Sequence, residues 1–259
     1  MEKETLRIAA VADIHVKKTG QGSMHALFEA ATGQADVLLL CGDLTDYGAV
    51  EEAKILAKEI TTSLRIPAIG VLGNHDFETG HQDEIVKILT DAGVTMLDGD
   101  VHEIHGVGFA GVKGFGGGFG RRQLGAWGEE IIKKFVHETV QEALKLEAAL
   151  VRLRTPQKIV VLHYAPIHAT VEGEPPEINP FLGSTRLEEP IDRYRVNAVF
   201  HGHAHRGSLE GRTKTNIPVY NVAMPLLAAK IPDKLPFRVV EVPIGAPSYN
   251  LAGATSGAG

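Results

Sequence analysis

Five apolar segments of this sequence each end on side chains that can bind a cation. The segment from Val37 to Cys41 runs into Gly42 and Asp43, and the segment from Leu6 to Ala12 runs into Asp13. The three others lead into Asn74-His75-Asp76, His163 and His203-Ala204-His205. Short apolar runs of this kind are typical of buried strands. Because ligands of open α/β sheets bind outside the carboxyl ends of the strands, we expect these polar residues to share one edge of the molecule.

Length and composition favour one large α/β domain. The chain has 259 residues, is 44% hydrophobic and 22% charged, and carries a net charge of −6, which argues against a strongly cationic nucleic-acid surface. The single cysteine, Cys41, excludes internal disulfides and fits a reducing compartment. No apolar run approaches the ~18 residues needed to span a bilayer, so we expect a cytoplasmic protein with no membrane partner.

Strand and helix patterns follow one another along the chain. Helical spacing of apolar residues predicts helices over 24–31, 50–62, 83–92 and 187–195, and strands are expected over 66–72, 158–162, 198–200, 219–222 and 238–242. Residues 101–104 and 107–110 are expected to form a hairpin in a second sheet. A long amphipathic helix is predicted from Glu129 to Arg154; we favour packing onto a sheet, with a dimeric coil as the alternative. The tail from Ala246 to Gly259 is small and polar and is predicted to be flexible.

Two longer segments have no regular pattern. The glycine-rich stretch from Gly111 to Arg122 lacks the spacing of a P-loop. It is interpreted either as a connector or as a loop over the polar edge, in which Arg121 or Arg122 binds a substrate phosphate. A loop of the length of Tyr164 to Thr185 is more often functional than filler, and its His168 and Glu172 are further candidates for substrate contact.

The polar residues at the strand ends match the needs of a two-metal site. Two divalent ions about 3.5–4 Å apart can clamp a phosphoryl group and present a hydroxide for in-line attack. A carboxylate bridges two cations best, and Asp43 is the candidate bridge. Neutral imidazoles favour transition metals such as Mn, Fe or Zn over Ca or Mg. Each short motif is weak evidence alone, whereas the ordered series, with every member just past a predicted strand, indicates a metal site.

This ordered series resembles the calcineurin-like metallophosphoesterases over about Leu6 to Arg206. The resemblance implies a two-sheet α/β sandwich flanked by helices. We expect the whole domain to span residues 1–245. It implies that the first ion takes Asp13, His15, Asp43 and His205, and the second Asp43, Asn74, His163 and His203. It further implies that His75 is the catalytic histidine, which contacts the phosphate together with Asn74, and that Asp76 orients His75. A carboxylate partner is a physically reasonable way to fix an imidazole tautomer.

Within the family, the amino-acid sequences of these motifs look most like those of the class III cyclic-nucleotide phosphodiesterase branch. The protein phosphatase branch usually has arginine directly before the Gly-Asn-His motif, where this chain has Leu72. Cyclic-nucleotide enzymes often carry two histidines at the third motif, whereas His163 is followed here by Tyr164. Among the remaining histidines, His201 is expected to pack beneath the metal ligands, with a supporting role toward them as the alternative. Local contacts are expected for His25, His81, His102, His105 and His137.

The function expected is that of a dinuclear-metal-dependent phosphoesterase. It would hydrolyse phosphodiester or phosphomonoester bonds by in-line attack of a metal-bridging hydroxide, on a small phosphoester for which a nucleotide is one candidate. The alternatives are a nuclease of the same superfamily and a non-catalytic metal-binding scaffold. Nothing basic is visible for nucleic-acid binding, and the scaffold would be expected to lack ligands or the catalytic histidine. A homo-oligomer is left open.

Overall fold

The computed structural model describes residues 4–244, which form two β-sheets packed face to face. The predicted tail lies outside these residues. The first sheet has the order β11 (Arg238–Pro243), β1 (Thr5–Val11), β2 (Val37–Cys41), β3 (Ala68–Val71) and β4 (Val94–Met96). The second has the order β5 (Asp100–Ile104), β6 (Val107–Gly111), β7 (Gln157–Val161), β8 (Ala198–His201), β10 (Pro218–Asn221) and β9 (Glu210–Arg212).

The strands in the middle of each sheet run parallel. In the first sheet β1 to β4 are parallel and β11 joins β1 antiparallel. In the second, β6, β7, β8 and β10 are parallel, with β5 and β9 as antiparallel edges. The expected hairpin of the second sheet is therefore confirmed as β5 and β6. Parallel pairing brings the carboxyl ends of neighbouring strands to one edge of each sheet, which is where the polar motifs begin.

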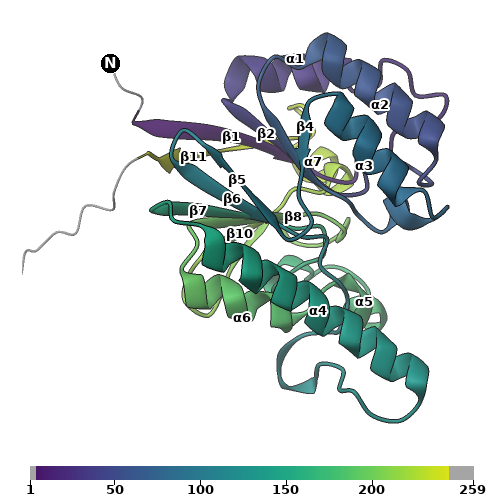
Figure 1. The fold of residues 1–259 in the computed structure, drawn as a ribbon, viewed down its shortest axis with the longest axis vertical. Coiled ribbons are helices and arrows are strands. Elements are labelled where there is room, and N and C mark those ends of the chain that lie inside the picture. Colours follow the sequence, from purple (N-terminus) through teal and green to yellow (C-terminus); the bar gives the residue numbers. More distant parts are fainter. Residues whose placement is uncertain (1–3, 245–259) are drawn as a thin grey trace, which may run out of the picture.

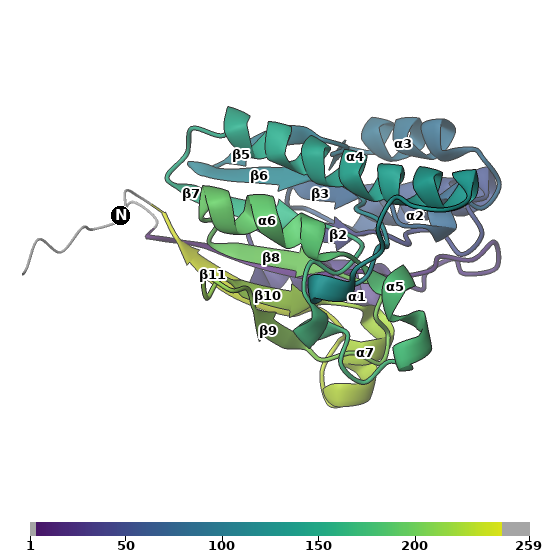
Figure 2. The same cartoon turned by 90° about the horizontal axis from the view of Figure 1, so that it is seen from below.

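Helices cover the outer face of each sheet, as Figure 1 shows. The helices α1 (His25–Gln34), α2 (Val50–Ser63) and α3 (Gln82–Asp91) pack on the first sheet, and α4 (Glu130–Arg152) and α6 (Thr185–Tyr194) pack on the second. The expected two-sheet α/β sandwich flanked by helices is confirmed. In Figure 2 the short helices α5 (Asn179–Leu182) and α7 (Met224–Lys230) lie at one end of the layers, beyond the ends of β8 and β10.

The alternation of side chains along the strands builds two kinds of core. In β2, Leu38 and Leu40 face the helices of the first sheet, whereas Leu39 and Cys41 face the second sheet. Both faces are dry, which explains why β2 is a continuous apolar run. Full burial of one leucine stabilises the fold by about 1.5–3 kcal/mol. This shared core holds the two sheets, and hence the loops at their ends, together. Burial of Cys41 raises the pKa of its thiol, as expected for a packing residue.

The apolar stripe of α4 packs on its own sheet. Leu146, Ala149 and Leu150 are buried in the core shared with the second sheet and α6, so the favoured interpretation of this helix is confirmed. Sequence patterns missed the short β4 and β9 and the helix α7. The long loop before α6 contains α5 and three-residue helical turns at His168–Thr170 and Pro176–Ile178. None of the helices between residues 4 and 244 is both long and apolar enough to span a bilayer.

Candidate metal centre

The loops after five strands bring seven of the sequence-predicted residues together. Asp13 and His15 follow β1, Asp43 follows β2 and Asn74 follows β3; from the second sheet come His163 after β7, and His203 and His205 after β8. Ligand atoms lie within 4.8 Å of one another in three groups, which are Asp13 with His15 and His205, His15 with Asp43 and His75, and Asp43 with His163 and His203. Asp43 belongs to two of these groups, as a bridging carboxylate requires.

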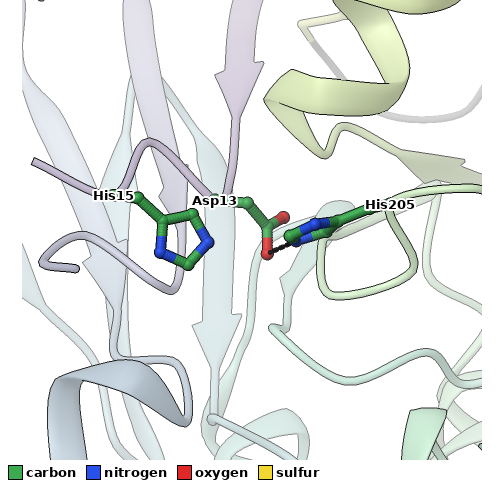
Figure 3. A group of neighbouring side chains, drawn as sticks. All are labelled: Asp13, His15 and His205. Carbon is green, nitrogen blue, oxygen red and sulfur yellow. Dashed lines mark hydrogen bonds and ion pairs between the residues drawn. The ribbon is translucent and has the colours of Figure 1, made fainter. Parts of the chain in front are cut away.

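Figure 3 shows the first group. Asp13 lies between two imidazoles that come from different sheets, and its Oδ1 is 2.9 Å from Nε2 of His205. His15 Nε2 lies 3.8 Å from Asp43 Oδ2, so this ring faces the central carboxylate as well. His15 Nδ1 is buried and has no hydrogen-bond partner within residues 4–244. Lys17 and Asp46 extend the polar shell on this side, with 3.9 Å between Nζ and Oδ2.

The backbone at these loops is strained. Asp13, His15, Asp43 and His203 all have positive φ, at 55°, 41°, 49° and 69°. Residues other than glycine seldom adopt this region, and each such residue costs on the order of 1–3 kcal/mol. These four residues lie in the turns that carry the candidate ligands, and the packing of the sandwich offsets the cost of their backbone conformation.

Two glycines allow the loops after β2 and β3 to come into close contact with His163 and Asp43. A Cβ on Gly42, whose φ is +86°, would lie 2.4 Å from His163 Nδ1. A Cβ on Gly73 would lie 2.2 Å from both the backbone nitrogen and Oδ1 of Asp43. Real Cβ atoms do not approach other atoms this closely. Glycine is therefore required at both positions for the side chains of the two sheets to meet at Asp43.

Backbone carbonyls fix which nitrogen of each imidazole faces the centre. His163 Nδ1 is 3.0 Å from the carbonyl oxygen of Cys41, and His203 Nε2 is 3.1 Å from that of Phe181. A carbonyl oxygen only accepts hydrogen bonds, so these nitrogens carry the protons and donate them. The other nitrogen of each ring then keeps a lone pair directed at the centre, which is the common arrangement for histidines that bind metals.

Lone pairs converge where a cation would sit. Nε2 of His163 faces Asn74 Oδ1 at 2.9 Å and Asp43 Oδ1 at 3.4 Å. With the proton of the ring on Nδ1 and the amide oriented as the structure has it, all three atoms are acceptors. Three acceptors that face one another repel unless a cation lies between them. The residues present therefore fit a metal ion by their chemistry as well as by their spacing.

Burial keeps most of the imidazoles neutral and ready to bind a metal. It lowers the pKa of His163 well below its usual value and that of His203 to about 3, and it lowers the pKa of His15. Burial also raises the pKa of Asp13 to about 6, whereas its hydrogen bond to His205 acts in the opposite direction. The same hydrogen bond raises the pKa of His205. Because the buried histidines need not lose a proton, a metal ion competes with few protons at neutral pH.

His75 has a different orienting partner from the one expected. Its Nδ1 donates to the backbone carbonyl oxygen of Asp46 over 2.7 Å, and its backbone N–H donates to Asp43 Oδ1 over 2.8 Å. The carboxylate of Asp76 instead accepts hydrogen bonds from the backbone N–H groups of Gly73 and Thr45 and from the Thr45 hydroxyl. The buried Asp76 therefore joins the loop after β2 to the loop after β3.

Three supporting residues were missed or only partly foreseen. The carbonyl oxygen of Asp46 orients His75, but a backbone contact leaves no signature in a sequence. The buried Asn221, at the end of β10, donates to the carbonyl oxygen of Ala204 over 2.8 Å, and Ala204 separates His203 from His205. His201 is fully buried, with Nε2 2.8 Å from the Thr170 hydroxyl. The expected burial of His201 is confirmed, and its position beneath the ligands stays a prediction.

Within residues 4–244 the side chains of the other substrate-binding candidates make no hydrogen bond, ion pair or ring contact with this cluster. Arg121 and Arg122 are exposed on a helical turn, and within the described part of the chain their guanidinium groups make no hydrogen bond or ion pair. The middle of their glycine-rich stretch packs on the α5 segment, where Gly117 N–H donates to the carbonyl oxygen of Pro180 over 2.6 Å. His168 pairs with Glu172 at 3.5 Å on the surface. A phosphate-binding role of Arg121 and Arg122 stays a prediction.

Comparisons with known proteins agree with this geometry. The family model described as calcineurin-like phosphoesterase matches residues 6–207. Among solved structures, the phosphopantetheinyl hydrolase from Mycobacterium tuberculosis has a TM-score of 0.64 at 16% identity, covering 97% of this chain and 98% of its own. The protein TT1561 of Thermus thermophilus has a TM-score of 0.53 at 15% identity, covering 93% and 100%. A putative 5′-nucleotidase from Staphylococcus aureus, solved in complex with alpha-ketoglutarate, has a TM-score of 0.52 at 14% identity, covering 84% of this chain and 48% of its own. At these identities the likeness concerns the fold. No curated protein sequence matches the chain.

Proposed function

Because the chain belongs to the calcineurin-like phosphoesterase family and is thereby a metal-dependent phosphoesterase, we propose that it hydrolyses small phosphodiesters with two transition-metal ions. The observation that carries the proposal is the convergence on Asp43 of ligand atoms from both sheets. Among solved relatives, one is named for hydrolysis of phosphopantetheinyl groups and another as a putative 5′-nucleotidase, and small phosphoesters are the substrates we propose. We propose diesters rather than monoesters because the motif sequences most resemble those of the class III cyclic-nucleotide phosphodiesterase branch.

We assign the ligands in two sets that share Asp43. The first ion would be held by Asp13, His15, Asp43 and His205, and the second by Asp43, Asn74, His163 and His203. Imidazole-rich sets of this kind favour Mn, Fe or Zn. Bound ions would polarise the phosphoryl oxygens and supply a hydroxide nucleophile at neutral pH.

His75 is the proposed acid for the leaving oxygen. The Asp46 carbonyl oxygen holds the proton on Nδ1, so Nε2 is the nitrogen available to a substrate. When the ring is protonated, Nε2–H can donate to the oxygen that departs from phosphorus. The backbone N–H of His75 donates a hydrogen bond to Asp43, and this bond holds His75 next to the central carboxylate. General acid catalysis of this kind contributes about 10²–10⁴-fold.

Turnover of bis-p-nitrophenyl phosphate by the Mn-loaded protein tests the proposal. We expect His75→Ala to lose roughly 10²–10⁴-fold in kcat while it retains its metal, and Asp43→Asn to lose both metal and activity. His137→Ala is the matched control, because His137 is an exposed histidine of α4 away from the cluster. Absence of turnover above the His75→Ala level would refute the enzymatic proposal. Absence of stoichiometric metal would favour a scaffold, and degradation of single-stranded DNA that is lost in Asp43→Asn would favour a nuclease.

A further inference from the structure

A cavity of about 470 Å³ opens directly beside the candidate metal centre. One wall consists of His203, His205 and Arg206, and the facing wall includes Ile178, Phe181 and Leu182. We call this cavity the α5 pocket, after the helix that carries two of its apolar residues. Its volume is in the range of small-molecule sites, roughly 300–1,000 Å³. A larger cavity of about 940 Å³ beside β11 contains none of the candidate ligands.

The apolar wall of the α5 pocket is open to solvent yet held in place. Ile178 is 39% exposed and Phe181 is 57% exposed. The wall is anchored from behind, because Leu182 is buried, its carbonyl oxygen accepts from Ala165 N–H over 3.0 Å, and the Phe181 ring packs edge-on against Phe135 at 6.0 Å. The hydrogen bond from His203 to the Phe181 carbonyl oxygen joins the two walls. The pocket is therefore preformed and continuous with the proposed site of chemistry.

Few polar groups line the α5 pocket. None of its described lining residues is Ser, Thr, Asn, Gln or Tyr. The charged side chains in the lining, apart from the histidines, are those of Glu174 and Arg206. The carboxylate of Glu174 already accepts the backbone N–H of Arg206 over 2.6 Å. Apolar contact is what the pocket mainly offers a ligand.

The position of the pocket indicates which part of a substrate it would hold. His75, the proposed acid for the leaving oxygen, does not line it. The ring of His15 contacts both His75 and His205, which lines the pocket: its centroid is 4.5 Å from that of His75 and 5.7 Å from that of His205. A phosphate bound at the centre would therefore direct its leaving group toward His75 and its other substituent toward α5.

We propose that the α5 pocket binds an apolar substituent on the phosphate, namely the ester group that is retained when the other leaves. This inference rests on the proposed phosphodiesterase function and specifies its substrate class: diesters whose retained group is an alkyl or similarly apolar chain. Each methylene that enters such a pocket improves binding about fourfold when fully buried.

Two esters with the same leaving group test the inference. Methyl p-nitrophenyl phosphate and butyl p-nitrophenyl phosphate differ only in the retained group. We expect the Mn-loaded protein to favour the butyl ester by about tenfold in kcat/KM, since the open pocket buries part of the added chain. Ile178→Ser should reduce that ratio by severalfold. Leu235→Ser is the matched control, because Leu235 is a similarly exposed leucine, at 43%, that lines the other cavity; it should leave the ratio unchanged.

Equal kcat/KM for the two esters, or a ratio that Ile178→Ser leaves unchanged, would overturn the inference while the phosphodiesterase activity stands. Faster turnover of a nucleoside 5′-p-nitrophenyl phosphate than of the butyl ester would also overturn it. Calorimetric titration of the Mn-loaded protein with butylphosphonate and methylphosphonate gives a readout that does not depend on turnover. If neither of these esters nor bis-p-nitrophenyl phosphate is cleaved, the proposed function fails, and tighter binding of butylphosphonate that Ile178→Ser abolishes would still support the pocket. Equal binding of the two phosphonates would refute it.

Discussion

Replacing Gly42 by alanine tests whether the close approach of the two sheets positions His163. Gly42 lies between the end of β2 and Asp43, and its φ of +86° is unfavourable for any L-residue with a side chain. The added Cβ would lie 2.4 Å from Nδ1 and 2.6 Å from Cγ of His163. The ring can avoid this overlap only by leaving the carbonyl oxygen of Cys41, which fixes its tautomer and direction.

The cost of this substitution has two parts that a control can separate. A left-handed backbone costs a residue with a side chain roughly 1–2 kcal/mol, and overpacking in a core adds roughly 1–3 kcal/mol. Gly80 has a similar φ of +73°, but a Cβ added there would meet nothing within 4 Å, so Gly80→Ala carries the backbone part alone. We expect Gly42→Ala to lower the free energy of unfolding by about 2–5 kcal/mol, against about 1–2 kcal/mol for Gly80→Ala.

Urea denaturation and elemental analysis give the two readouts. Gly80→Ala should keep the metal content of the wild type, and Gly42→Ala should hold about one ion fewer, because a displaced His163 no longer completes the second set of ligands. The reasoning is refuted if the two variants show the same loss of stability and the same metal content.

Three further predictions concern the support of the centre. Asn221→Ala should lower the free energy of unfolding by about 2–4 kcal/mol, because it leaves buried backbone groups unpaired. It should also raise the Mn concentration that gives half-maximal activity. If that concentration does not change, Asn221 does not position the turn at Ala204. Burial lowers the pKa of His201 from 6.5 to about 4, so the unfolded chain takes up a proton before the folded one and stability falls as the pH falls from about 6.5 to 4. The free energy of unfolding should fall by about 2 kcal/mol between pH 7.5 and pH 5 because of His201. In urea denaturation, the metal-free His201→Gln variant should show a correspondingly weaker dependence of this free energy on pH. An unchanged dependence would contradict the prediction. Removal of both ions by a chelator should lower the Tm by roughly 10–20 °C, since each ion present at about 100 times its Kd contributes about 2.7 kcal/mol. Asp43→Asn, measured by the same scan, should show no such shift.

The strand ends of this chain were predictable because one physical rule places them. Parallel strands with apolar faces must pack side by side, so residues as distant in sequence as Asp13 and His205 meet at one edge once the strands are recognised. The partner of His75 was not predictable in the same way. The carbonyl oxygen of Asp46 orients it, and any residue type at position 46 would supply that atom.

Tertiary packing also decided what the sequence patterns left open. Asn221 belongs to no motif, and its importance comes from three backbone groups that meet only in the folded chain. The strands β4 and β9 have three residues each, too few for an alternation of side chains to be recognised. The stripe of α4 was readable as a packing face, but the choice between a sheet and a second helix depended on the sheet beside it.

The division of the candidate ligands between two sheets has a consequence for how the enzyme is made. When a ribosome has released only the first four strands of the first sheet, Asp13, His15, Asp43 and Asn74 are available, whereas His163 and the turn at His205 have yet to be synthesised. A nascent chain at that stage could offer an ion only an incomplete cage. The complete set of candidate ligands exists only after translation has passed residue 205, so we expect metal to be loaded late in biogenesis.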